Sequence, residues 1–415
     1  MSRYQPYPEY KDSGVEWIGE VPAHWGAEKV GNLFAELNDR GGSKDQLLAV
    51  SQEHGVLPQA EYAATVDRRL SQSQSGDYSN YKSVEPRSFV YNKMRMWQGA
   101  IGLSRYSGCV SPAYVTFRAL HPVDENFYFG VFRTGGFVSE VNRLSQGICD
   151  DQNSCSFSDF RTIFVPSPPH REQSQIATFL DRETTRIDTL IEKKQRFIEL
   201  LEEKRQAVIT HAVTKGLDPN VPMKDSGVEW IGEVPAHWEK CQLKNLAAVC
   251  NGRDYKTVED PDGQYPVIGS GGQFAWASEC LYDGESVLFG RKGTIDKPLY
   301  INGPFWTVDT MFYTLLSKRA IGKYVYYVAT IIPYDSLSTN TALPSMTQED
   351  LSSLNLTVPD TAEQSQIATF LDRETTRIDT LIEKTRQSIE LLKERRSALI
   401  TAAVTGKIDV REEAA

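Results

Sequence analysis

The chain contains Glu172-Gln-Ser-Gln-Ile-Ala-Thr-Phe-Leu-Asp-Arg-Glu-Thr-Thr-Arg-Ile-Asp-Thr-Leu-Ile-Glu-Lys193, which returns unchanged as Glu363 to Lys384. A second repeated stretch, Lys11-Asp-Ser-Gly-Val-Glu-Trp-Ile-Gly-Glu-Val-Pro-Ala-His-Trp25, returns as Lys224 to Trp238. The copies are offset by 191 residues in the first case and by 213 in the second, and the segments between them differ. The chain therefore consists of two halves that share a frame and carry different inserts, the first insert being 22 residues longer.

Both copies of the first stretch open a long segment with helical spacing. Its apolar residues recur at intervals of three and four, which is typical of a helix with one apolar face. Pro168 after Ser167 suits a first helical position, and Thr361 with Gln364 three residues on has the spacing of a capping box, so we expect helices to start there. The apolar positions expected to contact the partner helix are Ile187, Leu190, Ile191, Ile198, Leu201, Val208, Ile378, Leu381, Ile382, Ile389, Leu392 and Leu399.

From Gln173 to about Thr210 such a helix is on the order of 55 Å long at ~1.5 Å per residue, too long to bury its apolar face within one small domain. The second helix has a matching length, so we expect the two to pack as a coiled coil. An approximate two-fold axis between the halves makes them antiparallel, with one insert at each end and the helices as a spacer. The segments around Trp17 and Trp230 are expected to wrap the helix ends, and the C-terminal tail to lie near Lys11.

The composition indicates a globular protein. With 415 residues, 40% hydrophobic and 24% charged, the chain suits two globular domains plus connecting helices. No apolar run approaches the roughly 20 residues that span a bilayer, and the N-terminus lacks the apolar core of a signal peptide, so we expect a cytoplasmic protein. The six cysteines form no CxxC pair and have irregular spacings, which argues against a zinc site or a disulfide framework.

The net charge of −10 does not exclude nucleic acid as a partner. Binding a phosphate backbone needs only a local basic face, whereas net charge describes the average field. Any basic surface is therefore expected in the inserts, and acidic faces elsewhere are free for protein partners.

The two inserts share an outline although their sequences differ. In the second, Gly284 to Ile295 is an apolar strand that runs into a turn with glycine and basic residues, and in the first, Pro86 to Ile101 does the same over a longer stretch. Each is followed by another strand, Ala113 to Phe117 and Thr310 to Thr314. We interpret the inserts as diverged copies of one mixed α/β domain, so the predicted fold class is α+β, with two similar domains joined by two long antiparallel helices.

Cations and aromatic residues gather around these turns. Gly293 beside Arg291 and Lys292 lets the backbone approach a phosphate, and long polar side chains such as Gln98 and Asn92 read base edges. For any single aromatic residue, ordinary core packing stays the alternative, and for any single cation, a solvated surface charge. The candidate DNA-binding residues are Tyr81, Lys82, Asn92, Lys93, Arg95, Trp97, Gln98, Arg105, Arg253, Tyr255, Lys256, Arg291, Lys292 and Thr294.

Motifs of common enzyme classes are missing from the sequence. It has no GxxxxGK[ST] for ATP, no [DN]PP[YF] of an amino-methyltransferase, no HExxH and no GxSxG. The segment from Ser167 to His170 differs from the methyltransferase tetrapeptide at both ends, where the amide or carboxylate and the aromatic residue would hold a flipped base. The sequence therefore predicts no catalytic residue, no bound metal and no bound cofactor.

The order of these motifs resembles the specificity subunit of type I restriction-modification systems. S-G-V-E-W-I-G-E-V-P-x-x-W precedes each insert, and E-Q-x-x-I-A-x-F-L-D-x-E-T-x-x-I-D with a long helix follows each, so the resemblance covers nearly the whole chain. It implies target recognition domains at residues 26–171 and 239–362, each reading one half of a split, asymmetric DNA site. The frame then comprises residues 1–25, 172–238 and 363–415.

The resemblance also implies partners in a bacterial or archaeal cytoplasm, close to the nucleoid. Two modification subunits would bind S-adenosylmethionine and methylate adenine N6, and restriction or translocase subunits would bring ATP and Mg²⁺. The chain itself would bind double-stranded DNA without catalysing a reaction. Two other hypotheses stay open from the residues alone, namely a coiled-coil adaptor that joins proteins without touching DNA and an unrecognised nuclease.

Overall fold

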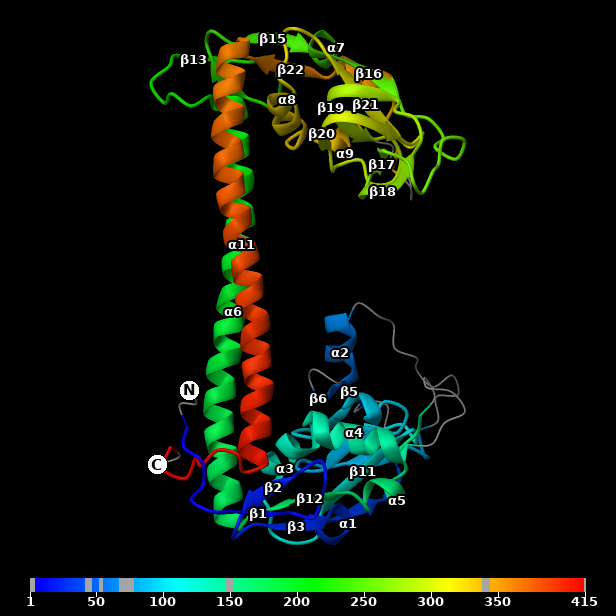
Figure 1. Cartoon of the computed structure of the whole chain (residues 1–415), viewed down its shortest axis with the longest axis vertical. Coiled ribbons are helices and arrows are strands. Elements are labelled where there is room, and N and C mark those ends of the chain that lie inside the picture. The colour runs from blue at the N-terminus through cyan, green and yellow to red at the C-terminus, as the bar shows by residue number, and fades with distance from the viewer. Residues whose placement is uncertain are drawn as a thin grey trace. The chain divides into compact units, whose positions relative to one another are not determined.

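The computed structural model describes residues 4–41, 47–51, 55–66, 78–145, 153–337 and 344–413. It divides into two compact units, one formed by Met1–Lys193 with Ser388–Ala415 and the other by Lys194–Gln387. Two long helices, α6 and α11, pass through both units, so each unit holds one part of each helix and one domain of mixed strands and helices (Figure 1). The predicted α+β class with two domains joined by long helices is confirmed.

The first domain is built on an antiparallel sheet with strand order β4-β11-β8-β9. Helix α3 begins at Glu125 because the Asp124 side chain accepts the backbone N–H groups of Asn126 and Phe127. The sheet strands are β4 (Phe34–Leu37), β11 (Tyr114–Ala119), β8 (Phe89–Asn92) and β9 (Ile101–Leu103), and the helices around them are α1 (Val30–Leu33), α2 (Gln59–Val66), η2 (Met96–Gln98), α3 (Glu125–Phe132), α4 (Gly135–Leu144) and α5 (Phe157–Phe160).

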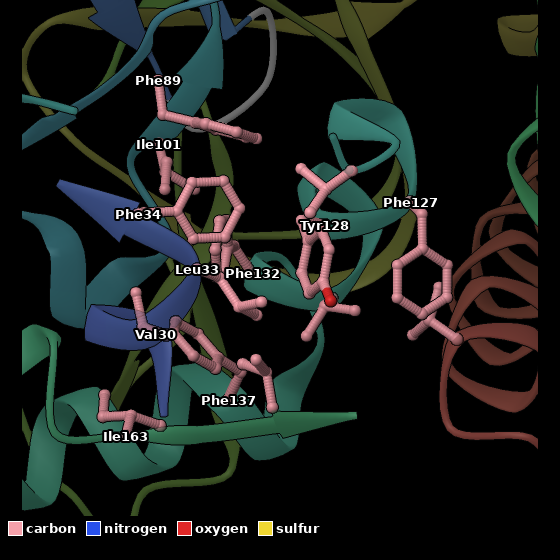
Figure 2. Close-up of a cluster of buried hydrophobic side chains, with 14 of the residues drawn as sticks. Val30, Leu33, Phe34, Phe89, Ile101, Phe127, Tyr128, Phe132, Phe137 and Ile163 are labelled. Carbon is pink, nitrogen blue, oxygen red and sulfur yellow. The ribbon is translucent and has the colours of Figure 1, made fainter. Parts of the chain in front are cut away.

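The core of this domain is aromatic. Phe89 stacks on Phe117 with ring centroids 5.0 Å apart, and Phe34 meets both rings edge to face. Phe132 and Phe137 from α3 and α4 close the cluster (Figure 2). Offset and edge-to-face contacts of this kind add to the stabilisation from area burial, so the sheet is held firmly against its helices.

Short antiparallel pairs complete the first unit. They connect the frame to the domain and extend the domain beyond its main sheet. The pairs are β1 (Tyr10–Asp12) with β2 (Glu20–Pro22), β3 (Gly26–Lys29) with β12 (Phe164–Ser167), β5 (Leu48–Ser51) with β6 (Gly55–Pro58), and β7 (Lys82–Val84) with β10 (Gly108–Val110).

The second domain carries a six-stranded sheet with order β16-β21-β19-β20-β17-β18. Its first four strands follow the same order as the first domain's sheet, and only β17 and β20 pair in parallel. The elements are α7 (Leu243–Leu246), β16 (Ala247–Asn251), β17 (Tyr265–Gly269), β18 (Gly272–Ala277), β19 (Tyr282–Gly290), β20 (Leu299–Thr307), β21 (Met311–Leu316), α8 (Gly322–Ala329), α9 (Tyr334–Leu337) and α10 (Gln348–Ser353), with the pairs β13 (Met223–Asp225) and β14 (Glu233–Pro235), and β15 (Glu239–Gln242) and β22 (Asn355–Val358).

Helices α6 (His170–Lys215) and α11 (Thr361–Val404) lie side by side and run antiparallel (Figure 1). In the first unit Arg396 Nε lies 2.8 Å from Asp188 Oδ1, and in the second Arg205 Nε lies 3.0 Å from Asp379 Oδ1. In both pairs a residue late in one helix meets a residue early in the other, which fixes the direction.

The contact between the helices is narrower than the apolar pattern suggests. Leu201, Ile378 and Ile382 form a buried cluster with Ile198 packed against it, whereas some of the expected contact residues are exposed. Leu190 and Leu381, at equivalent positions of the two helices, are 41% and 39% exposed. A pair of helices buries only a narrow seam, so these leucines next to Ile191 and Ile382 fall outside it. The burial of the other expected residues is as follows: Ile187 and Ile389 are buried, and Ile191, Val208, Leu392 and Leu399 are half-buried.

The predicted helix starts hold to within two residues. Helix α6 begins at His170, two residues after Pro168. The capping box at Thr361 is wrong, because Asp360 caps α11 through the backbone N–H of Glu363 at 2.9 Å. The Gln364 side chain instead donates from Nε2 to the carbonyl oxygens of Pro359 and Arg319, at 3.0 and 2.9 Å. The Gln364 amide is therefore hydrogen-bonded to backbone groups outside its own helix.

The repeated frame makes the same joints in both units. Gln173 Oε1 accepts the backbone N–H of Asp124 at 2.9 Å, and Gln364 Oε1 accepts that of Ile321 at 3.0 Å. These N–H groups lie at the starts of α3 and α8, the helices that enter the two domains. Each repeated glutamine therefore connects the start of a long helix to its own domain.

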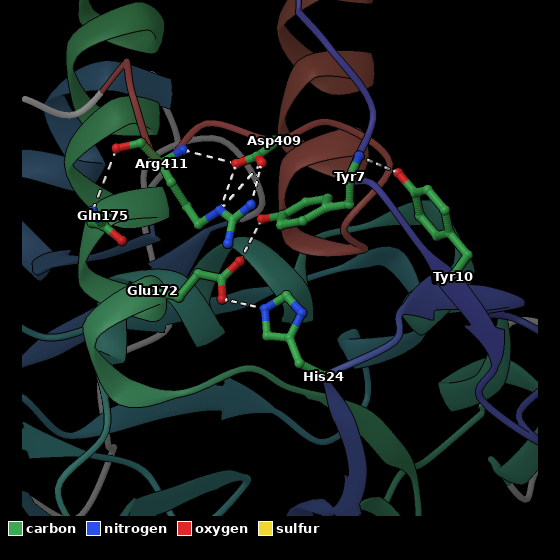
Figure 3. Close-up of polar contacts among 7 residues, drawn as sticks. All are labelled: Tyr7, Tyr10, His24, Glu172, Gln175, Asp409 and Arg411. Carbon is green, nitrogen blue, oxygen red and sulfur yellow. Dashed lines mark hydrogen bonds and ion pairs between the residues drawn. The ribbon is translucent and has the colours of Figure 1, made fainter.

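A second joint is the glutamate beside each glutamine. Glu172 accepts the Tyr7 hydroxyl at 2.5 Å and lies 2.8 Å from His24 Nε2 (Figure 3). Burial and then the Glu172 hydrogen bond raise the pKa of Tyr7, so the hydroxyl stays protonated and donates. Glu363 contacts His237 at 2.7 Å in the same way. The two histidines therefore have a structural role in the frame, as their positions inside the repeats indicate.

The C-terminal tail lies against the N-terminal segment within the first unit. The Asp409 backbone N–H donates to Gln5 O at 2.8 Å, and the Arg411 guanidinium lies over the Tyr7 ring at 5.0 Å. Lys407 Nζ donates to Glu20 O at 2.6 Å, where the other half has Lys215 donating to Glu233 O. The expected closeness of the tail to the first frame segment therefore appears as direct contacts.

Candidate nucleic-acid interface

In the second domain, separate chain segments meet around the turn at residues 307–310. The Arg253 N–H donates to Thr307 O at 2.9 Å, and the Arg291 N–H donates to Thr310 O at 2.8 Å. Arg291 Nη1 also reaches Asp309 O at 3.3 Å. We call residues 251–256, 290–295, 307–310 and 344–348 the second-domain loop cluster.

Glycines allow the backbones of this cluster to approach closely. A Cβ atom on Gly252 would lie 2.0 Å from Val308 O, and one on Gly290 would lie 2.0 Å from Thr294 O. Gly293 has φ +81, a conformation that other residues rarely adopt. Its N–H donates to Pro344 O at 2.9 Å, so the basic turn is fixed in place by its backbone.

The predicted residues of the second domain differ in how exposed their side chains are. Arg253, Lys292 and Thr294 are exposed in the loop cluster, and Arg291 is half-buried there. Tyr255 is half-buried, with its ring packed edge to face against Phe274 at 5.1 Å, in a small core beside β17 and β18. Lys256, the remaining candidate, is exposed at the turn that follows Asp254. The structure thus brings the two arginines together and assigns Tyr255 mainly to packing.

The first domain has the same arrangement at Lys93. The Lys93 N–H donates to Ala113 O at 3.1 Å, and its carbonyl accepts the Cys155 N–H at 3.0 Å. Arg291 makes the equivalent contacts, because its carbonyl accepts the Met346 N–H at 3.0 Å. We call residues 38–41, 78–82, 92–98, 110–114 and 153–155 the first-domain loop cluster. Lys93 and Arg291 therefore occupy equivalent places in the two domains.

The turn after Lys93 carries several predicted residues. Asn92 Oδ1 accepts the Met94 N–H at 2.9 Å, and Trp97 Nε1 donates to Met94 O at 3.0 Å, so both side chains stabilise the turn itself. Arg95 and Gln98 are exposed on it. Of this group, the arginine and the glutamine are the side chains displayed to a ligand.

The remaining first-domain candidates are less accessible or lie elsewhere. Lys82 is 7% exposed, and its ammonium lies 3.1 Å from Glu36 Oε1, so its charge is neutralised within the domain. Tyr81 is half-buried against Tyr78, and burial raises the pKa of its hydroxyl. Arg105 follows Ser104, which pairs with the residue before β8 rather than the residue after it, so it lies at the other end of the hairpin from Lys93.

Four residues in these clusters were missed by the sequence reasoning. Asn38-Asp39-Arg40 follows β4, and Asn251-Gly252-Arg253 begins at the last residue of β16, at an offset of 213 that equals the frame offset. Strand register confirms the equivalence, since β4 pairs with β11 as β16 pairs with β21. Aligning the two halves from the frame would have found this Asn-x-Arg recurrence. The missed residues are Asn38, Arg40, Asn251 and Gln348.

Gln348 was missed because it is 97 residues away from Asn251 along the chain. Asn251 Nδ2 donates to Gln348 Oε1 at 3.0 Å, and Gln348 Nε2 donates to Val249 O at 2.7 Å. Helix α10, which begins at Gln348, therefore covers the free edge of β16.

Metal and membrane sites receive no support from the described part of the chain. Within it, no group of three or more His, Cys, Asp or Glu side chains is placed to hold a metal ion. None of its helices is long and apolar enough to cross a membrane. Cys109 and Cys155 are buried and Cys280 is exposed, while Cys149 lies outside the described residues.

A family model and a curated relative that match parts of this chain both come from type I restriction systems. Residues 235–391 match the family model of the type I restriction modification DNA specificity domain. The specificity subunit of the type I restriction enzyme EcoDI from Escherichia coli is 22% identical over 181 residues, which cover 43% of this chain and 40% of that protein. The matched segment thus spans less than half of the length of this curated relative.

Solved structures extend the likeness to nearly the whole chain. A chain from a structure on complex assembly and conformational transition of the type I R-M system has a TM-score of 0.72, at 13% identity over 92% of this chain and 98% of that one. The HsdS subunit from Thermoanaerobacter tengcongensis has a TM-score of 0.56, at 14% identity over 94% and 98%. At such identities these matches show a shared fold. Together with the family match over residues 235–391, they confirm the resemblance to type I restriction-modification specificity subunits that the repeats predicted.

Proposed function

We propose that this chain is the DNA sequence-specificity subunit of a type I restriction-modification complex. The observation that carries the proposal is the recurrence of Asn-x-Arg at one place in two otherwise different domains, beside equivalent basic turns at Lys93 and Arg291. The same frame thus presents two unlike polar and basic surfaces. Each domain reads one half of a bipartite, asymmetric DNA site.

The loop clusters have the chemistry for duplex DNA despite the net charge of −10. Arg253 and Lys292 are exposed, and Arg40 and Arg95 are exposed in the other domain. Cations of this kind contact phosphates and place the protein on the duplex, while amides and arginines read base edges in the grooves.

The long helices act as the spacer between half-sites and as the docking surface for modification subunits. Support for docking comes from exposed leucines at duplicated positions. Leu190 and Leu381 are 191 residues apart, as are Leu200 and Leu391, and all four are more than a third exposed. Exposed apolar side chains on an otherwise charged surface are typical of protein contacts. Because each feature occurs twice, we propose two modification subunits for each chain.

The chemistry belongs to the partners in this proposal. Modification subunits bind S-adenosylmethionine and methylate adenine N6, and restriction or translocase subunits bring ATP and Mg²⁺. The chain contributes recognition and geometry, and it works on chromosomal DNA in a bacterial or archaeal cytoplasm.

The deciding experiment maps N6-methyladenine in DNA from cells that carry this chain with its modification subunits. We expect one bipartite motif with two unequal halves, separated by a fixed number of unread bases. A continuous or palindromic motif contradicts the assignment of one unlike half-site to each domain. No sequence-specific methylation, together with no salt-dependent binding to duplex DNA, would favour a protein adaptor instead.

A further inference from the structure

Asn251 occupies a distinctive position in the second-domain loop cluster. It is the last residue of β16, its side chain is exposed, and it directly precedes Gly252 and Arg253. Gly252 is buried against the 307–310 turn, where a Cβ atom would lie 2.0 Å from Val308 O. The amide is therefore presented next to an exposed guanidinium.

A relay of hydrogen bonds fixes the orientation of this amide. The Val249 carbonyl oxygen only accepts, so the Gln348 group 2.7 Å from it must be the NH₂. The Gln348 oxygen then faces Asn251 at 3.0 Å, and the Asn251 group that meets it must also be an NH₂. Asn251 Oδ1 has no hydrogen-bond partner among the residues that the structure describes. Asn251 thus displays one acceptor and one remaining N–H donor in a known order.

We propose that Asn251 reads an adenine in the half-site of the second recognition domain, with Gln348 as its positioning residue; this inference rests on the proposed function. In the major groove adenine presents the N6 amino donor beside the N7 acceptor, which an oriented amide satisfies with two hydrogen bonds. Guanine presents two acceptors at the same edge, O6 and N7, so the Asn251 oxygen would face an oxygen. The relay therefore selects adenine over guanine.

The first domain offers a natural comparison. Asn38 is exposed at the equivalent place, but Phe157 stands where Gln348 stands in the second domain, 191 residues earlier. Phe157 is buried and has no amide, so it cannot form the relay. The oriented amide is a property of the second domain and does not follow from the shared frame.

The first test replaces Asn251 and maps methylation in cells that also carry the modification subunits. Asn251→Ser and Asn251→Asp should each alter one position, in one half of the bipartite motif, and leave the other half unchanged. Asn302→Asp is the matched control, because Asn302 is an exposed asparagine of the same domain outside the loop cluster, in β20. An unchanged motif for both Asn251 variants, with an intact bipartite motif for the wild type, overturns this inference and leaves the proposed function standing.

The second test measures binding of the assembled complex to duplexes that carry each base at the affected position. For the wild-type complex, replacing the adenine should weaken binding by about ten- to hundred-fold, and for Asn251→Ser by less than about three-fold. A position that proves to be guanine or cytosine in the wild-type motif refutes the reading of adenine.

Gln348→Leu tests the positioning role. Without the relay the Asn251 amide rotates, so discrimination at that one position should fall while every other position of the motif keeps its preference. A purely structural role for Gln348 would instead lower methylation at all positions together or leave the motif as it is, and either result contradicts positioning. Thermal unfolding of the variant separates loss of fold from loss of discrimination.

Discussion

Replacing Gln364 by methionine should loosen the joint between α11 and the second domain. Methionine has nearly the same length and shape, but it makes none of the three hydrogen bonds of the amide. These bonds join Oε1 to the Ile321 N–H at 3.0 Å, and Nε2 to the Pro359 and Arg319 carbonyls at 3.0 and 2.9 Å. The residue is 1% exposed, so water cannot replace them.

The expected cost follows from these contacts. Each lost hydrogen bond contributes about 1 kcal/mol, and a buried N–H left without a partner costs about 1–3 kcal/mol. For Gln364→Met we expect a local destabilisation of about 3 kcal/mol. Gln173 makes two such bonds, to the Asp124 N–H and to Pro168 O, both at 2.9 Å, so Gln173→Met should cost about 2 kcal/mol.

Amide hydrogen exchange measures this change locally, which matters because a chain of two units need not unfold in one step. A loss of about 3 kcal/mol should speed exchange of the Ile321 amide by roughly a hundred-fold. Ser365→Ala, a change at an exposed neighbour on the same helix, is the control and should leave the rate unchanged. If Ile321 exchanges at the wild-type rate in Gln364→Met, the joint does not stabilise the start of α8 and the reasoning is wrong.

Three further outcomes are expected. Arg253→Ala should reduce the slope of the logarithm of the DNA-binding constant against the logarithm of the salt concentration by about 0.9, which corresponds to one phosphate contact. Lys82→Met should leave this slope unchanged because the Lys82 ammonium is already paired with Glu36. Equal effects of the two changes would contradict this distinction. Leu200→Ser should weaken binding of modification subunits by about ten-fold with unchanged helical content, since this leucine is exposed in the free chain, and full binding by the variant would remove it from the docking surface. At pH 8 a thiol reagent should modify exposed Cys280 well before Cys155. Burial raises the pKa of Cys155 to about 12, which leaves almost no thiolate below pH 10. Mass spectrometry of the labelled peptides checks the order, and early labelling of Cys155 would contradict its burial.

The architecture could be predicted from the sequence because the segments that form the frame occur twice in the chain. Identical repeats fix two halves, and a long apolar pattern needs a partner of equal length, which only the other helix provides. The narrow seam was harder to foresee. Leu190 and Ile191 are both apolar, and the spacing alone does not say which of them faces the partner.

The candidate sites were predictable only in outline. Glycine-rich basic turns mark Lys93 and Arg291 correctly as equivalent places, because a backbone turn is a local property. Whether a cation is free is a tertiary property, and Lys82 is neutralised by Glu36, 46 residues earlier. The amide relay at Asn251 joins segments still further apart in sequence, so no local pattern reports it.

The joints of the frame also explain how one frame carries two unlike domains. Gln173 and Gln364 contact their domains through the backbone N–H groups of Asp124 and Ile321, groups that every residue except proline possesses. The frame therefore constrains where a domain helix starts and leaves its side chains free. Loops such as the one at Asn251 can then change without disturbing the joint, which is what a protein needs if its two reading surfaces are to differ on a common support.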